Sequence, residues 1–369
     1  MFKKEFSKYD WEKIKKSIYS KKAKEVEYVL EKPEINLDDF KALISPAAKP
    51  FLEFMAKKSN RLTQKRFGKI IQLFLPLYLS NECTNHCVYC GFNQNNNIDR
   101  LTLDKDQILK EVEAIKSLGY EHILLVTGEH HQKAGFDYIK DAIELIKPYF
   151  SLISIEIQPL EQDEYKQLID IGLNTVYVYQ ETYNKIKYPD YHPAGKKSDF
   201  YYRLDTPDRV GKAGIHRIGI GCLLGLEDWR TDSYYTAEHL KYLERKYWRT
   251  RYSISFPRLR PNAGNFQTSS QITDQDLVQL ICAYRLLDPE VELSISVRES
   301  MKFRDHIMKL GITSMSAGSR TEPGGYALNT HALEQFEVHD NRTPAEIEKM
   351  IKLNGYEPVW KDWDRYMQI

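Results

Sequence analysis

Three cysteines lie close together in the first third of this 369-residue chain, where Cys83, Cys87 and Cys90 have the spacing Cys-x3-Cys-x2-Cys. They follow the apolar run 70–79, which has the composition of a buried strand. A loop at the end of a strand can place three thiolates around a cluster of four irons, leaving one iron without a protein ligand. Electron carriers normally fill all four positions with cysteine, so the vacancy predicts a cluster that does chemistry.

Structural zinc is the alternative for these cysteines, with His86 as a fourth ligand. Zinc sites generally combine two Cys-x2-Cys pairs, or cysteines with downstream histidines. A Cys-x3-Cys step is unusual there, and the chain has no second Cys-x2-Cys. The spacing therefore favours a cluster. An iron–sulfur electron carrier or scaffold without chemistry of its own is a further alternative, which fits the vacant iron position less well.

The composition is that of a reduced globular protein. The chain has 53 basic and 52 acidic residues, which gives no overall bias toward nucleic acid. It has no apolar run long enough to span a membrane and no apolar core of a signal peptide, so we expect a cytoplasmic protein without a membrane span. The other cysteines, Cys222 and Cys282, fall in a predicted strand and a predicted helix, where buried free thiols are typical.

Short β-rich runs alternate with amphipathic helices through most of the chain. The predicted strands are 70–79, 122–127, 152–158, 174–179, 216–222, 252–256, 292–297 and 312–316. Helix start signals lie between them: Asp104 and Gln107 form a capping box, and Thr273 can cap a later helix. Eight strands alternating with helices predict an α/β fold, a closed parallel (βα)8 barrel, with an open doubly wound sheet as the alternative.

The predicted barrel leaves a segment at each end of the chain. Residues 1–66 have the pattern of helices and form an N-terminal extension. The barrel is predicted to occupy 67–322. Residues 323–369 are then a C-terminal extension packed on the barrel, in which Thr343-Pro344-Ala345-Glu346 opens a helix with a capping box and a proline at its first position.

Polar and glycine-containing segments follow the second to fifth predicted strands, at the barrel face where (βα)8 enzymes do their chemistry. In chain order, the candidate residues in these segments are Thr127, Gly128, Glu129, Glu156, Glu181, Arg203 and Gly221. Glycine at position 128 lets the backbone approach a ligand, and Glu129 can accept a hydrogen bond from an ammonium group.

Arginines and serines lie in or just after the last three predicted strands; the candidates are Arg258, Arg260, Arg298, Ser314, Ser316 and Arg320. Arginine binds carboxylate through two parallel hydrogen bonds, so these residues suit a substrate that carries a carboxylate. For Arg258 and Arg260, ion pairs with Glu299 and Glu322 at the rim are the alternative. Arg298 is the better candidate, because a strand-end position is rigid and directed inward.

The cysteine spacing resembles that of the radical S-adenosylmethionine (SAM) enzymes. In that family the open iron of a 4Fe-4S cluster binds the amino and carboxylate groups of SAM, and the reduced cluster releases a 5′-deoxyadenosyl radical. The resemblance implies SAM contacts by Tyr89 at the adenine, Thr127, Gly128 and Glu129 at the amino group, Glu181 at the ribose, Arg203 at the carboxylate and Gly221 in the adenine segment, with Glu156 as a further contact.

Longer runs resemble the tyrosine lyases that make dehydroglycine (2-iminoacetate) for the thiazole ring of thiamine. The resemblance extends from about residue 65 to the end of the chain and includes 252–261, 316–320, 323–326 and 360–364. It implies cleavage of L-tyrosine between Cα and Cβ to dehydroglycine and p-cresol, with 5′-deoxyadenosine and methionine as co-products. It also implies a thiazole synthase as protein partner and a reduced flavodoxin or ferredoxin-type electron donor.

Other radical SAM reactions fit the chain less well. Tryptophan lyases share the early motifs but differ more in the C-terminal run. The tyrosine lyase that matures iron–iron hydrogenase carries a C-terminal cysteine cluster, whereas this chain has no cysteine after Cys282. Sulfur insertion would require a second set of cluster ligands, and methylation on the same barrel is the remaining alternative.

Overall fold

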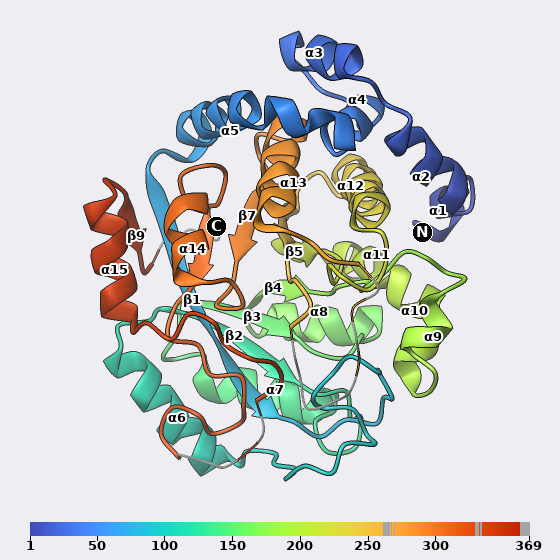
Figure 1. Cartoon of the computed structure of the whole chain (residues 1–369). Helices are drawn as coiled ribbons and strands as arrows, with labels where there is room; N and C mark the ends of the chain where they lie inside the picture. Colours follow the sequence, from blue (N-terminus) through green and yellow to red (C-terminus); the bar gives the residue numbers. More distant parts are fainter. Residues whose placement is uncertain (261–265, 267, 269, 329–331, 333, 362–369) are drawn as a thin grey trace.

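The computed structural model describes the whole chain except residues 261–265, 267, 269, 329–331, 333 and 362–369. Eight parallel strands close a barrel, because the order β2-β3-β4-β5-β6-β7-β8-β1 is completed by pairing of β1 with β2 (Figure 1). The strands are β1 (Ile70–Ser80), β2 (His122–Thr127), β3 (Leu152–Glu156), β4 (Leu173–Tyr177), β5 (Arg217–Ile220), β6 (Arg251–Ser255), β7 (Glu292–Ile295) and β8 (Ser314–Ser316). The predicted (βα)8 fold is confirmed, and the open sheet is excluded.

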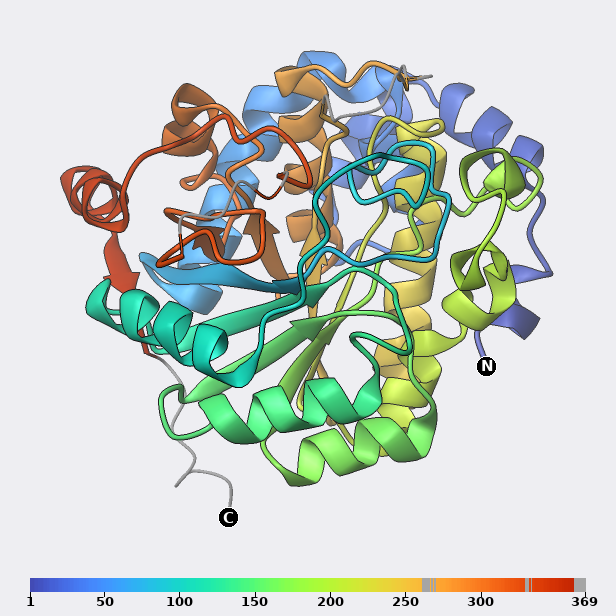
Figure 2. The same ribbon diagram turned by 90° about the horizontal axis from the view of Figure 1, so that it is seen from below.

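Helices cover the outside of the barrel (Figure 2). They are α6 (Lys105–Ser117), α7 (Phe136–Ile146), α8 (Gln162–Asp170), α11 (Thr206–Ala213), α12 (Trp229–Lys246), α13 (Asp274–Leu287) and α14 (Met301–Ile307). Both predicted caps form, since Asp104 accepts the backbone N–H of Gln107 and Thr273 accepts that of Asp276. Three short helices, α9 (Tyr188–Tyr191), η2 (Lys196–Ser198) and α10 (Phe200–Leu204), lie in the long connection after β4.

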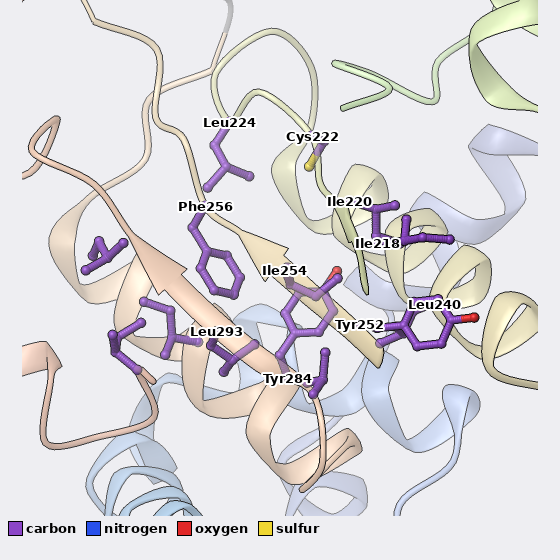
Figure 3. Packing of buried hydrophobic residues seen from close by; sticks show 14 of the residues in the cluster. Ile218, Ile220, Cys222, Leu224, Leu240, Tyr252, Ile254, Phe256, Tyr284 and Leu293 are labelled. Atoms are coloured by element: carbon purple, nitrogen blue, oxygen red, sulfur yellow. The ribbon is translucent and has the colours of Figure 1, made fainter. Parts of the chain in front are cut away.

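The alternation of side chains along each strand divides the barrel wall into two faces. In β1, Leu73, Leu75 and Leu77 are buried in the main hydrophobic core, while Phe74 and Pro76 line the barrel lumen. The same core continues under α12 and α13, where side chains of β5, β6 and β7 pack against the helices (Figure 3); those labelled include Ile218, Ile220, Leu240, Tyr252, Ile254, Tyr284 and Leu293. This packing fixes where the strands end, and therefore where the strand-end residues lie.

The segment before the barrel forms α1 (Lys3–Phe6), α2 (Trp11–Tyr19), α3 (Ala23–Glu31), α4 (Leu37–Leu43), η1 (Pro46–Phe51) and α5 (Leu52–Phe67). These helices run along one side of the barrel, with contacts from α5 to α13 and from α2 and α4 to α12 (Figure 1). The buried Gln279 side chain joins the two parts, because it donates to the carbonyls of Leu43 and Ser45, each at 2.8 Å.

The described part of the C-terminal segment ends in α15 (Pro344–Leu353) and β9 (Glu357–Val359). Thr343 accepts the backbone N–H of Glu346, which confirms the capping box predicted there. The short strand β9, which the sequence pattern did not predict, pairs in parallel with the start of β1. Within the described residues, no helix is both long and apolar enough to cross a membrane.

Candidate cofactor and substrate site

Two neighbouring cavities lie at the carboxyl ends of the strands. The mouth cavity is lined by the cysteine loop and by the ends of β2, β3 and β4. The lumen cavity lies inside the barrel and is lined from β1, β2, β3, β4, β6, β7 and β8. The residues common to both cavities are Val126, Glu156, Tyr179, Pro257, Arg298, Gln335 and Phe336. The two cavities therefore meet, so a ligand bound in the mouth cavity would lie next to a ligand bound in the lumen cavity.

Cys83, Cys87 and Cys90 all line the mouth cavity as free thiols. Backbone hydrogen bonds tie the loop to the connection after β4: Val88 N–H donates to the Tyr191 carbonyl and His86 N–H donates to the Ala194 carbonyl. Burial disfavours the thiolate, so it raises the pKa of each of the three thiols. The sequence thus folds the three cysteines onto one cavity, as predicted.

The donors around this cavity fit a cluster. An iron–sulfur cluster is larger than a single ion, so its thiolate ligands stand around a cavity. Among the described residues, no group of three or more His, Cys, Asp or Glu side chains is placed to hold a single metal ion. The cationic side chains of Lys197 and Arg203 line the same cavity and suit the negative charge of thiolate ligands.

Two acidic and two basic side chains form an ion-pair network in the wall of the mouth cavity. Arg203 pairs with Glu129 at 2.9 Å, and Lys197 pairs with Glu181 at 2.6 Å. The amide of Asn85 donates to the second oxygen of Glu129 at 2.8 Å, which fixes that carboxylate from the cysteine loop. Burial alone would raise the pKa of Glu129, but the charges of Arg203 and Lys197 outweigh it and hold the pKa below its ordinary value. Glu129 is therefore charged, and its hydrogen bonds orient it before a ligand binds.

Glu181 has a strained backbone. Its φ of 70° is the one positive φ of a non-glycine residue in the described part of the chain. The conformation is held because the Glu181 carbonyl accepts the Leu223 N–H at 2.8 Å, and its carboxylate is held by Lys197. Such strain persists where surrounding contacts over-determine it, often at ligand sites.

Tyr89 also lines the mouth cavity. Its hydroxyl group hydrogen-bonds to Nε2 of His192 at 2.8 Å, and both residues are buried. Burial holds the pKa of His192 well below its ordinary value, so this imidazole is neutral. The tyrosine ring is thereby fixed beside the cysteines.

In the lumen cavity, Arg298 and Glu156 are the charged side chains that face each other. The Arg298 guanidinium stacks on the Phe336 ring, 3.3 Å from its centroid, and within the described residues it has no carboxylate at ion-pair distance. Burial and the neighbouring Glu181 raise the pKa of Glu156 to about 7, against the influence of Arg298. The cavity therefore carries an unpaired cation and a carboxyl group that titrates near neutrality.

Several candidates from the sequence take other positions. Arg258 and Arg260 both pair with Glu299, so the ion-pair interpretation holds for them, although Arg260 also lines the mouth cavity. Arg320 is exposed and lines neither cavity. Of the two serines on β8, Ser316 lines the lumen cavity, whereas Ser314 faces a smaller cavity nearer the base of the barrel.

Two glycines have packing roles. A Cβ on Gly128 would lie 2.2 Å from the Glu82 carbonyl oxygen, so glycine is needed here because the backbone of residue 82 passes close by. Gly128 also lines the mouth cavity. A Cβ on Gly221 would lie 2.8 Å from the Ser255 carbonyl oxygen and 3.2 Å from the Tyr179 ring. Gly221 lies outside the mouth-cavity lining, and it leaves room for Tyr179.

The sequence reasoning missed Asn85, Lys197, Gln335 and Phe336, which all line the mouth cavity. Asn85 lies inside the cysteine motif, and its polar amide could have indicated a residue that orients the site. Lys197 carries no motif: it comes close because its backbone N–H donates to the Asn85 side chain at 3.0 Å. Gln335 approaches from the C-terminal segment, where its amide lies 3.9 Å from the Cys90 sulfur.

Comparison with known proteins agrees with this geometry. Residues 77–234 match the model of the radical SAM superfamily, and residues 255–357 match the Biotin and Thiamin Synthesis associated domain. The chain is 50% identical to the 2-iminoacetate synthase of Escherichia coli over 359 residues, which is 97% of this chain and 95% of the relative. It is 25% identical to a biotin synthase of Francisella tularensis over 74% of this chain and 88% of the relative.

Among solved structures, HydG, a maturase of the FeFe-hydrogenase, superposes with a TM-score of 0.90 at 31% identity, covering 95% of this chain and 80% of HydG. Methylornithine synthase superposes with a TM-score of 0.74 at 18% identity, covering 91% and 97%, which shows the shared fold. These matches confirm the family inferred from the cysteine spacing. The chain belongs to the 2-iminoacetate synthase family of radical SAM enzymes, which are lyases that use a 4Fe-4S cluster and SAM.

Proposed function

We propose that the mouth cavity holds the cluster and SAM, and that the lumen cavity holds the L-tyrosine that the enzyme cleaves between Cα and Cβ. The products are dehydroglycine (2-iminoacetate), p-cresol, methionine and 5′-deoxyadenosine, and dehydroglycine supplies the thiazole of thiamine. One observation carries the proposal: a partly buried guanidinium, with no carboxylate at ion-pair distance among the described residues, and a carboxyl group line the same cavity, which opens onto three cysteines. An amino acid suits this pair, because its α-carboxylate can bind the guanidinium and its ammonium group can bind the carboxylate.

Different residues of the mouth cavity bind the cluster and SAM. Cys83, Cys87 and Cys90 hold the cluster, and Tyr89 packs on the adenine. When bound, the cluster and SAM supply one-electron reduction and a 5′-deoxyadenosyl radical at this cavity. Three further groups of residues bind the polar parts of SAM: Thr127, Gly128 and Glu129 at the amino group, Glu181 at the ribose and Arg203 at the carboxylate. The buried hydroxyl of Thr127 supports this, since it has no hydrogen-bond partner among the described residues.

The residues of the lumen cavity orient the substrate. Arg298 binds its α-carboxylate and Glu156 accepts its ammonium group, which turns the amino nitrogen toward the mouth cavity. The substrate ring then lies along apolar wall residues, among them Pro76, Leu124 and Phe256. An enclosed apolar wall keeps water from the imine product, which hydrolyses readily.

We further propose that a thiazole synthase consumes the dehydroglycine and that a reduced flavodoxin or ferredoxin-type protein supplies the electron. All five cysteines are free, which supports a reducing, cytoplasmic compartment.

The test is anaerobic incubation of reconstituted enzyme with SAM, dithionite and one aromatic amino acid at a time. We expect p-cresol and dehydroglycine with L-tyrosine, each equimolar with 5′-deoxyadenosine. An indole product from L-tryptophan, with no p-cresol from tyrosine, would identify a tryptophan lyase instead. An electron carrier would take up iron and pass electrons without cleaving SAM.

A further inference from the structure

The wall of the lumen cavity carries a row of three hydroxyl groups, one from β6, one from β7 and one from just after β4. Ser255 of β6 and Ser294 of β7 are paired in the sheet register, and their Oγ atoms lie 3.2 Å apart. The Tyr179 hydroxyl donates to the Ser255 Oγ at 3.1 Å, and all three side chains line the lumen cavity. We refer to Tyr179, Ser255 and Ser294 as the hydroxyl row.

The position of the hydroxyl row suits the far end of an amino acid whose carboxylate lies at Arg298. Ser294 lies on β7, and Arg298 lies in the turn that follows this strand, so Ser294 lies deeper in the barrel than Arg298. Ser296 and Val297 line the cavity between these two levels. A side chain that extends from Arg298 into the barrel therefore reaches the hydroxyl row.

The hydroxyl row has unused hydrogen-bonding capacity. Three hydroxyl groups carry three protons, and the two contacts within the row use two of them. One proton and several lone pairs thus remain for a ligand. The ring of Tyr179 is held in place because Gly221 has no side chain to displace it. The row is therefore a fixed polar patch on a wall that also carries apolar side chains, among them Phe74, Leu124 and Phe256.

We infer that the hydroxyl row binds the phenol hydroxyl group of L-tyrosine and selects tyrosine over phenylalanine. A site built to pair a substrate hydroxyl discriminates against an analogue that lacks it, because the buried polar groups of the site are then left unpaired. The inference rests on the proposed function, since it takes tyrosine as the ligand of the lumen cavity.

The experiment measures dissociation constants of L-tyrosine and L-phenylalanine by calorimetry, with cluster-loaded enzyme and no SAM, so that no turnover occurs. Ser255→Ala, Ser294→Ala and the double variant each remove hydroxyl groups with little change of volume. We expect tyrosine affinity to fall about fivefold per hydroxyl and phenylalanine affinity to stay or rise. The tyrosine-to-phenylalanine preference then falls more than tenfold in the double variant.

Ser154→Ala is the matched control, because Ser154 faces the smaller cavity nearer the base of the barrel and not the hydroxyl row. It should leave the preference unchanged. A double variant that keeps the wild-type preference while still making p-cresol overturns the inference and leaves the proposed function intact. Wild-type enzyme that fails to make p-cresol overturns the proposed function itself.

A second measurement needs no substitution, so it does not depend on the folding of the variants. Wild-type enzyme is titrated with L-tyrosine, 4-amino-L-phenylalanine, 4-fluoro-L-phenylalanine and L-phenylalanine. We expect the hydroxyl and amino compounds to bind at least tenfold more tightly than the other two, because only they pair with the row. Equal affinities for tyrosine and phenylalanine would overturn the inference.

Discussion

The mouth cavity and the lumen cavity adjoin but are built differently. Most of the mouth cavity comes from loops and strand ends, and its charged groups are already paired with one another, as in Glu129 with Arg203 and Glu181 with Lys197. The lumen cavity comes mainly from strand side chains, and its arginine has no ion-pair partner within the described residues. Paired charges keep the side chains of a site oriented before a ligand binds, whereas a partly buried cation without an ion-pair partner remains available to bind an anionic ligand.

The largest effect is expected at the cysteines. Replacing Cys83, Cys87 or Cys90 with alanine should abolish SAM cleavage, because each thiol lines the mouth cavity and a cluster with two ligands is not retained. Iron content and 5′-deoxyadenosine after anaerobic reconstitution measure this. Cys222→Ala and Cys282→Ala are the controls, since both thiols are buried outside the two cavities. One equivalent of zinc and no iron in anaerobically purified protein would contradict the prediction.

The next effect concerns the paired charges of the mouth cavity. Arg203→Ala leaves Glu129 without its ion-pair partner, so we expect weaker SAM binding, loss of both 5′-deoxyadenosine and p-cresol, and about 3–5 kcal/mol of lost stability. Calorimetric titration with SAM and thermal unfolding give the two values. Arg209→Ala is a matched control, because this equally buried arginine binds the Leu160 carbonyl outside the cavity. If the Arg209 variant loses SAM affinity as strongly, the assignment of Arg203 fails.

The corresponding change in the lumen cavity should separate substrate from cofactor. Arg298→Ala is expected to cost about 2–5 kcal/mol of tyrosine binding and to stop p-cresol formation, while slow uncoupled SAM cleavage continues. Product analysis of 5′-deoxyadenosine against p-cresol measures the coupling. Arg320→Ala is the comparison, since the sequence nominated it and the structure places it in the solvent. If the Arg320 variant stops making p-cresol and the Arg298 variant does not, Arg320 and not Arg298 binds the substrate carboxylate.

The smallest effect is a pH dependence. Glu156 must be ionised to hold an ammonium group, so kcat/KM for tyrosine should rise with pH and level off above about 7, the pKa of this carboxyl group. The groups that act on it are Glu181, Arg298, Lys197 and Arg203, together with Tyr78, Tyr177 and Tyr179, whose raised pKa values keep them neutral over this range. Glu156→Gln should lower kcat/KM and flatten the profile. An unchanged profile in this variant would show that another group titrates.

The two cavities also differ in how much of each the sequence predicted. The mouth residues lie in short motifs directly after strands, so a correct strand prediction places them together, as it did for Cys83 and Glu129. Lys197 was missed because it lies in a long connection without a motif. Its position depends on Gly195, where a Cβ would lie 2.2 Å from the Asn85 side chain.

Depth inside the barrel was harder to predict than the strand itself. Ser314 and Ser316 both point into the lumen, because residues two apart share a face. Two residues nevertheless span about 6.6 Å along the barrel, which places them in different cavities. Arg320 lies beyond Gly318, whose φ of 61° turns the chain, so its side chain no longer follows the alternation of β8. Strand β9 was missed because its three residues, one of them Pro358, depend on pairing with distant β1.

The stacking of the two cavities has a kinetic consequence. Their shared residues form the floor of the mouth cavity and the roof of the lumen cavity, and the Arg217–Glu292 ion pair, at 2.9 Å, lies nearer the base of the barrel. On the assignment proposed above, in which SAM occupies the mouth cavity, a substrate that enters through the mouth passes the place of SAM. The order of addition is then compulsory, amino acid first and SAM second. Inhibition by excess SAM follows from this order, since early arrival of the cofactor traps an enzyme with an empty lumen.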